Sequence, residues 1–276
     1  MINPKFNLEG KTALITGGAG LLGIEHAIAL LETGCKVVIT DISTEALNKA
    51  QVQINNQIKI QEDNLLTLVM DVTKSSSIKS CQLLLSKDDI SINILINNAT
   101  IDPKVKRNEN RRNLSMFENF ERSQWEKEIE VGLTGAFQCS QIFGSEMAKN
   151  KNGVILNIAS DLSIIAPDQR IYKKKNKDYQ FFKPVTYSVI KTGLIGLTKY
   201  IATYWAKDGI RCNAISPGGV MNNQDEEFID NLTKLIPLGR MASKDEYRSA
   251  IQFLCSDASS YMTGFNLIID GGRHIW

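Results

Sequence analysis

The chain has 276 residues, of which 43% are hydrophobic and 22% are charged, and its formal net charge is +2. This balance is ordinary for a globular protein and too near neutral to indicate a nucleic-acid partner. No apolar run reaches the roughly 20 residues of a membrane helix, no apolar leader follows the start, and the five cysteines show neither metal-binding nor disulfide spacing. We therefore expect a cytoplasmic protein with no membrane and no nucleic-acid partner.

Short apolar runs alternate with helical stretches along the whole chain. The expected strands are Ala13–Thr16, Val37–Thr40, Leu66–Met70, Ile92–Ile96, Val154–Ile158, Arg211–Ile215 and Leu267–Ile269. The expected helices are 21–32, 44–54, 75–86, 123–149, 186–206 and 243–255. Because most strand runs are continuously apolar, they are typical of strands buried on both faces of a parallel sheet. The pattern predicts a single doubly wound α/β domain over residues 1–276, with seven parallel strands and helices on both faces.

The first expected strand leads into a glycine turn, TGGAGLLG at residues 16–23. Gly17 allows a tight turn, Gly20 and Gly23 follow at spacings of three, and a helix begins behind them. Backbone N–H groups and the positive end of a helix dipole then meet at one point, which suits a pyrophosphate. An ordinary turn between strand and helix would also use glycines, but this position at the first strand favours a dinucleotide site.

Asp41 ends the second expected strand, 18 residues after Gly23. A carboxylate there can accept hydrogen bonds from both ribose hydroxyls of NAD and would repel the 2′-phosphate of NADP. No Arg or Lys lies beside it in the sequence to offset that repulsion. The same carboxylate could instead cap the helix that starts at Thr44. We expect NAD rather than NADP.

Tyr187 and Lys191 are four residues apart in an expected helix, so they share one helix face. A neighbouring ammonium stabilises a phenolate and lowers the tyrosine pKa from about 10, which makes Tyr187 a candidate general acid/base. Ser160, which follows an expected strand, could hydrogen-bond the same substrate oxygen. Alone, such a Tyr–Lys pair is more often a solvated helix face.

Taken together, the motifs resemble the short-chain dehydrogenase/reductase family, in its single-domain branch. The matching segments, in family order, are 16–23, Asp41, DVT 71–73, NNA 97–99, NIAS 157–160, YSVIK 187–191, RCNAISPGG 211–219, PLGR 237–240 and YMTGFNLIIDGG 261–272. The resemblance implies a Rossmann fold, catalysis by Ser160, Tyr187 and Lys191, a homodimer or homotetramer, and a lid at about 219–240. The residues it implies at the cofactor are Gly17, Gly20, Leu22, Gly23, Asp41, Asp71, Val72, Asn98, Tyr187, Lys191, Pro217, Gly218 and Val220.

Three features depart from the family pattern. Gly132 stands where the family has the asparagine that completes a catalytic tetrad, so the proton-relay water loses its usual holder. Leu21 stands where a glycine is usual, as in the branch rich in sugar epimerases. Ser160 and Tyr187 are 27 residues apart, which implies an insertion at about 161–185.

The insertion is basic, with a net charge of +4 over 168–183, and segment 104–112 is also +4, so the remaining chain carries −6. We hypothesise an anionic substrate, a phosphorylated or nucleotide-linked sugar. Its candidate binding residues are Arg170, Lys173, Lys174 and Lys175. The alternative is a pair of solvated loops. The departures also resemble oxidoreductases of bacterial nonulosonate and flagellin-glycan synthesis.

The sequence therefore predicts NAD-dependent hydride transfer at a hydroxyl or keto carbon, with a small-molecule substrate. Three alternatives stay open: a 3-oxoacyl-thioester reductase, an epimerase or dehydratase that uses NAD transiently, and a non-catalytic NAD-binding regulator, which Gly132 alone favours.

Overall fold

A computed structural model describes residues 3–59, 62–101, 115–173 and 180–276. Seven parallel strands form one sheet in the order β3-β2-β1-β4-β5-β6-β7, which confirms the expected doubly wound sheet. The strands are β1 (Thr12–Thr16), β2 (Lys36–Asp41), β3 (Leu65–Val69), β4 (Ile94–Asn97), β5 (Gly153–Ile158), β6 (Ile210–Pro217) and β7 (Asn266–Ile269).

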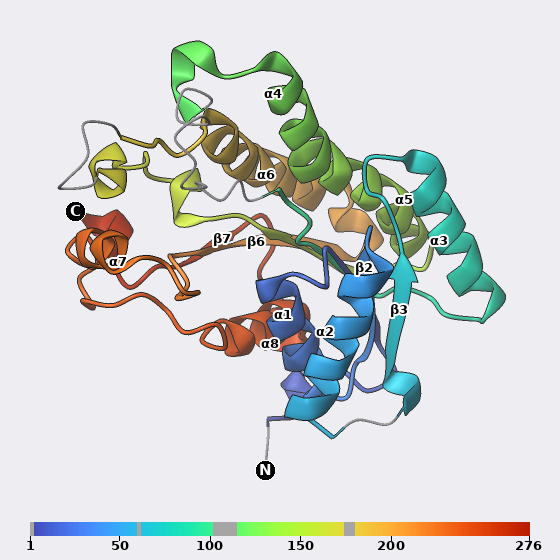
Figure 1. The fold of residues 1–276 in the computed structure, drawn as a ribbon. Coiled ribbons are helices and arrows are strands. Elements are labelled where there is room, and N and C mark those ends of the chain that lie inside the picture. The colour runs from blue at the N-terminus through green and yellow to red at the C-terminus, as the bar shows by residue number, and fades with distance from the viewer. Residues whose placement is uncertain (1–2, 60–61, 102–114, 174–179) are drawn as a thin grey trace.

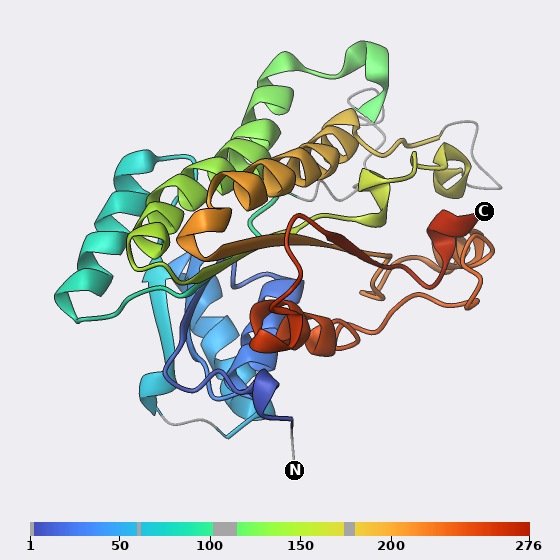
Figure 2. The same ribbon diagram turned by 180° about the vertical axis from the view of Figure 1, so that it is seen from behind.

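Helices cover both faces of the sheet (Figures 1 and 2). On one face lie α1 (Leu21–Leu31), α2 (Thr44–Gln57) and α8 (Arg248–Cys255), and on the other lie α3 (Ser75–Lys87), α5 (Gly135–Lys149) and α6 (Val185–Tyr204). Strand β1 shows why its run is apolar throughout. Ile15 packs into the cluster under α1, whereas the adjacent Leu14 packs into the cluster under α5. Side chains alternate along a strand, so a strand covered on both faces needs apolar residues at every position.

The expected helix 123–149 is interrupted. It consists of α4 (Arg122–Ile129), a π-helical turn at Glu130–Thr134, and α5. Gly132 lies in this turn, and a Cβ atom there would be 2.8 Å from Cγ2 of Ile190 on α6. The apolar periodicity that predicts one helix does not reveal the extra residue in the π turn.

The expected helix 243–255 is also shorter, because α8 begins only at Arg248. The residues before it form a hydrogen-bonded turn instead. Ser243 Oγ donates to Asp245, and Arg240 bonds Glu246 through both terminal nitrogens at 2.6 Å. These local side-chain bonds compete with helix formation.

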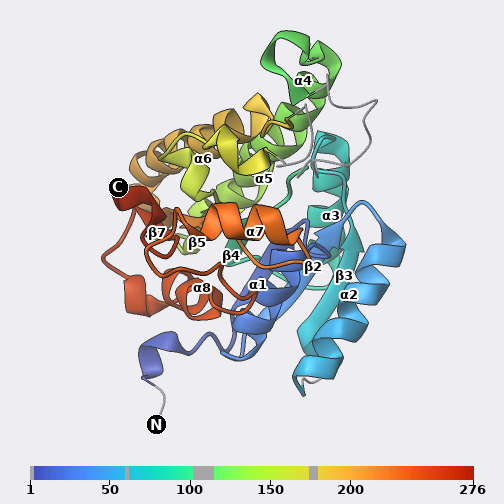
Figure 3. The same cartoon turned by 60° about the vertical axis from the view of Figure 1, so that its left-hand side comes forward.

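Additional structure lies at the carboxyl edge of the sheet, where strand order reverses between β1 and β4. Helix α7 (Glu226–Thr233) packs there against the short helix Gln169–Tyr172 of the insertion (Figure 3). Ile171, Leu232 and Met241 belong to their shared apolar cluster. Ligands of doubly wound sheets bind at this reversal, so the cluster stands beside the expected ligand crevice. None of the described helices is both long and apolar enough to traverse a bilayer.

Candidate active site

A cavity of about 1100 Å³ opens at this edge of the sheet. Its wall joins segments that are far apart in the sequence. The sequence-predicted site residues that line it are Gly17, Gly20, Leu22, Asp41, Asn98, Ser160, Lys173, Tyr187, Lys191, Pro217, Gly218 and Val220. A volume of this size, at the point where strand order reverses, accommodates a dinucleotide together with a small substrate.

The glycine turn is closely packed where a dinucleotide would approach. Gly17 has a φ of +59°, and a Cβ on it would lie 2.8 Å from the Cα of Ala99. At Gly23 a Cβ would lie 2.6 Å from the carbonyl oxygen of Gly17, so this glycine is needed for helix packing. Asn98 Nδ2 donates to the carbonyls of Thr16 and Gly17 at 3.0 and 2.9 Å and holds the turn in place. The residues present therefore fit a pyrophosphate at the start of α1.

Asp41 ends β2 at the cavity wall, and its role as a helix cap is excluded. Ser43 caps α2, because its Oγ accepts the Ala46 N–H at 3.1 Å. The side chain of Asp41 accepts only the Ser43 N–H, at 3.3 Å, among the described residues. Its carboxylate is thus available to the two hydroxyls of a ribose.

Tyr187, Lys191 and Ser160 all face the same cavity. Lys191 is 4% exposed, and its Nζ donates to the carbonyl oxygen of Ile158 at 2.7 Å. That ammonium lies 5.6 Å from the centre of the Tyr187 ring. The hydrogen bond to the Ile158 carbonyl thus holds the Lys191 ammonium near the Tyr187 ring.

Two further charged features of this site were missed by sequence reasoning. Lys183 Nζ lies 3.7 Å from the centre of the Tyr187 ring. In the sequence, Lys183 precedes Tyr187 by four residues and Lys191 follows it by four. Lys183 precedes α6, so helical spacing gives no signal for it. Asp161 and Arg273 form an ion pair of 2.7 Å and are both buried. They are 112 residues apart, and nothing in their local sequence indicates that they meet.

Some predicted residues do not line the cavity. Arg170 is one: its side chain is 87% exposed and bonds the carboxylate of Asp168 at 2.7 Å. Arg170 therefore lies outside the cavity, although Lys173, three residues later, lines it. Lys174 and Lys175 lie outside the described residues.

Gly23, Asp71 and Val72 also lie away from the cavity wall. Val72 is buried against Gly135, and Asp71 pairs with Lys74 at 3.1 Å. A hydrogen bond from the Thr73 hydroxyl holds the pKa of the Asp71 carboxyl below its usual value. In the described part of the chain, no group of His, Cys, Asp and Glu side chains could hold a metal ion.

Comparison with known proteins covers nearly the whole chain. The family model described as enoyl-(acyl carrier protein) reductase matches residues 19–274. An NAD-dependent glycerol dehydrogenase of Listeria innocua is 33% identical over 98% of this chain and 96% of its own. A gluconate 5-dehydrogenase from Burkholderia cenocepacia, solved with NADP and tartrate, has a TM-score of 0.83 and 27% identity over 99% of this chain and 98% of that one. A short chain dehydrogenase from Leptospira borgpetersenii with bound NAD+ has a TM-score of 0.82 and 31% identity over 99% and 96%.

Proposed function

The chain belongs to the short-chain dehydrogenase/reductase family, and on that premise we propose that it is an NAD-preferring oxidoreductase acting on a hydroxyl or keto carbon of a small anionic substrate. The family makes it an NAD(P)-dependent enzyme. One observation carries the proposed chemistry: two ammonium groups, those of Lys183 and Lys191, lie near the ring of Tyr187 on a cavity that Ser160 and the glycine turn also line.

In the proposed mechanism Tyr187 and Ser160 act on the same substrate oxygen, and Lys191 acts on Tyr187. A bound nicotinamide supplies or accepts the hydride. Tyr187 transfers the proton at the reacting oxygen. Ser160, whose proton lies toward Asp161 Oδ1 at 2.8 Å, orients that oxygen by accepting a hydrogen bond from a substrate hydroxyl, or by turning its proton to a keto oxygen. Lys191, anchored on the Ile158 carbonyl, stabilises the phenolate that forms when Tyr187 has given up its proton.

The preference for NAD rests on the Asp41 carboxylate, which would repel a 2′-phosphate and which forms no ion pair with a described cationic side chain. The similar proteins include both an NAD-dependent enzyme and one solved with NADP, so the carboxylate of this chain is the better guide to its cofactor.

An anionic substrate is supported by two observations. The similar gluconate 5-dehydrogenase is named for a sugar acid and was solved with tartrate, which is also a hydroxy acid. In this chain Lys173, Lys183 and Arg273 line the same cavity as Ser160. We keep a phosphorylated or nucleotide-linked sugar of glycan synthesis within this class, together with sugar acids.

Reduction of an acyl thioester is the second candidate, and the description of the matching family model favours it. The two candidates differ in the carbon chain that the cavity must accept. NADH consumption with acetoacetyl thioesters but with no keto sugar acid or phosphosugar would select the thioester reaction.

The test of the proposed chemistry is Tyr187→Phe, which keeps the aromatic ring near the two ammonium groups and removes only the hydroxyl. We expect turnover of the best substrate of such a panel to fall about 10²–10⁴-fold. The affinity for NADH, followed by its fluorescence, should change little. Full turnover in this variant would contradict the role of Tyr187, and absence of NADH binding by the wild-type protein would contradict the proposed function as a whole.

A further inference from the structure

Arg273 is a buried cation whose hydrogen-bonding capacity the fold leaves largely unused. Its side chain is 7% exposed and lines the cavity. Nη1 donates to Asp161 Oδ2 at 2.7 Å, and no other described residue accepts a hydrogen bond from the guanidinium. A guanidinium carries five N–H donors. No nitrogen of Arg273 is among the fully buried polar atoms of the described residues that lack a partner, so its remaining donors are accessible from the cavity and can bind a ligand.

Arg211 shows how this chain treats an arginine with a purely structural role. Its guanidinium makes four hydrogen bonds within the protein, to the Ser259 hydroxyl and to the carbonyls of Leu254, Ser256 and Met262. Arg170 shows what the free edge of Arg273 can do. Nε and Nη2 of Arg170 grip both oxygens of Asp168, at 2.8 and 2.7 Å. In Arg273 the same pair of nitrogens has no carboxylate among the described residues.

Net charge does not explain which ligand this cavity selects. Among the described residues, four cations line it, Lys173, Lys183, Lys191 and Arg273, and so do four acids, Asp41, Asp161, Asp225 and Glu227. Balanced charges of this kind give little general attraction for an anion. Selection must then come from a particular group with unsatisfied donors, and the free guanidinium edge of Arg273 is such a group.

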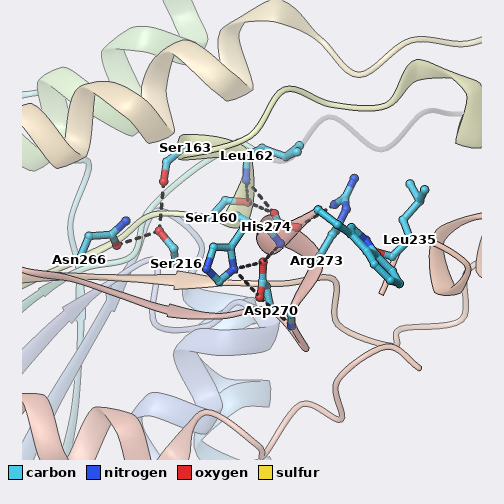
Figure 4. A network of polar contacts seen from close by, with 12 residues as sticks. Ser160, Leu162, Ser163, Ser216, Leu235, Asn266, Asp270, Arg273 and His274 are labelled. Carbon is cyan, nitrogen blue, oxygen red and sulfur yellow. Dashed lines mark hydrogen bonds and ion pairs between the residues drawn. The ribbon is translucent and has the colours of Figure 1, made fainter. Parts of the chain in front are cut away.

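One carboxylate joins Arg273 to the proposed catalytic serine. Asp161 Oδ1 accepts from Ser160 Oγ at 2.8 Å, and Oδ2 accepts from Arg273. Figure 4 shows Ser160 and Arg273 in this polar network. The Leu162 N–H, also at 2.8 Å, holds Oδ1 from the backbone. The serine hydroxyl and the guanidinium are thus separated by no more than one carboxylate and two hydrogen bonds.

We propose that Arg273 determines specificity by binding an anionic oxygen group of the substrate, a carboxylate or a phosphoryl group, while Ser160 bonds the reacting oxygen. Asp161 is then a positioning residue, which sets the span between the two contacts. This assignment rests on the proposed function and gives its anionic substrate a definite place. It also replaces Arg170, which faces solvent, as the arginine of the substrate site.

The test compares three six-carbon polyol probes: gluconate carries a carboxylate, glucitol 6-phosphate carries a phosphate, and glucitol carries neither. Their binding to the NAD-loaded protein is measured by calorimetry, which does not depend on turnover. The main variant is Arg273→Lys, which keeps a cation for the buried Asp161 but loses the planar fork. Arg170→Lys is the matched control, because its arginine fork already holds an acidic side chain.

We expect the wild-type protein to bind one of the anionic probes at least tenfold more tightly than glucitol. If the group is a carboxylate, Arg273→Lys loses most of the preference for gluconate. If Arg273 binds a phosphoryl group, the wild-type protein prefers glucitol 6-phosphate. Arg273→Lys then loses less of that preference, since an ammonium binds phosphate as a point charge. Arg170→Lys should change neither value.

Equal binding of all three probes by the wild-type protein, or an unchanged preference in Arg273→Lys, would overturn the assignment. Should Arg273→Lys unfold at a lower temperature, the double variant Asp161→Asn with Arg273→Gln removes both buried charges together and is judged by the same preference. The two proposals fail separately: anion binding without turnover contradicts the oxidoreductase chemistry, whereas turnover without an anion preference contradicts only the role of Arg273.

Discussion

At the scale of single residues, contacts within the fold fix the side chains of this site in the cavity wall. Lys191 donates a hydrogen bond to the Ile158 carbonyl, and its ammonium lies near the Tyr187 ring. Asp41 has no such structural contact to make at α2, because the Ser43 side chain caps this helix. The carboxylate is therefore not needed by the fold and can act on a ligand.

Replacing Asp41 by Ser should change the choice of cofactor. Without the carboxylate, the 2′-phosphate of NADP no longer meets a negative charge, while NAD loses its two ribose hydrogen bonds. We expect NADPH to bind about tenfold more tightly and NADH about tenfold more weakly, each about 1.4 kcal/mol. Both affinities follow from fluorescence titration. Glu45→Gln, which removes an exposed carboxylate from the adjoining α2, should leave the ratio unchanged, and an unchanged ratio in Asp41→Ser would show that another group selects the cofactor.

At the scale of elements, the π turn at Glu130–Thr134 packs closely against helix α6 because Gly132 has no side chain. Ile190, directly before Lys191, fills the space over Gly132. Residues of π turns often mark functional sites. Here the turn meets the helix that carries Tyr187 and Lys191, so packing at Gly132 acts on the position of both.

The pair Gly132 and Ile190 should therefore show strong coupling. Gly132→Asn alone places a Cβ 2.8 Å from Cγ2 of Ile190, which cannot move freely because it is buried, and we expect a loss of about 1–3 kcal/mol in stability. Ile190→Ala alone leaves a cavity and costs about 2–5 kcal/mol. The double variant should be more stable than the sum of the two losses implies, by at least about 0.5 kcal/mol in urea unfolding. Additive losses would show that the two positions do not share this space.

At the scale of the whole molecule, the sequence predicts what depends on local patterns. All seven strands follow from apolar runs. Burial on both faces requires such runs in the inner strands, whereas the edge strands β3 and β7 are only partly buried. The glycine turn and the Tyr187–Lys191 spacing are also local. The π turn in helix 123–149 is not predicted, since apolar periodicity does not reveal it, and neither is the close approach of Ile190 to Gly132 from another helix. The pairing of Asp161 with Arg273 joins segments that only the complete sheet brings together.

The free energy of unfolding of the whole molecule also depends on pH through the buried His26. This residue of α1 is fully buried, and neither ring nitrogen has a hydrogen-bond partner among the described residues. Burial disfavours the charged imidazolium and lowers the pKa of His26 from 6.5 to about 3. In the unfolded chain the ring regains its ordinary pKa near 6.5.

The sign of the pH dependence follows from these two values. Between pH 6.5 and about 3, the unfolded chain binds a proton at His26 that the folded protein does not bind. The free energy of unfolding therefore falls as the pH is lowered through this window, by about 1.4 kcal/mol per pH unit from this group. His26→Met, which fills the site with an apolar side chain, should remove that part of the slope. Urea unfolding of both proteins at pH 7.5 and 5.0 measures it: we expect the wild-type protein to lose about 2 kcal/mol more than the variant. Equal losses would mean that His26 takes up a proton in the folded state as readily as in the unfolded chain.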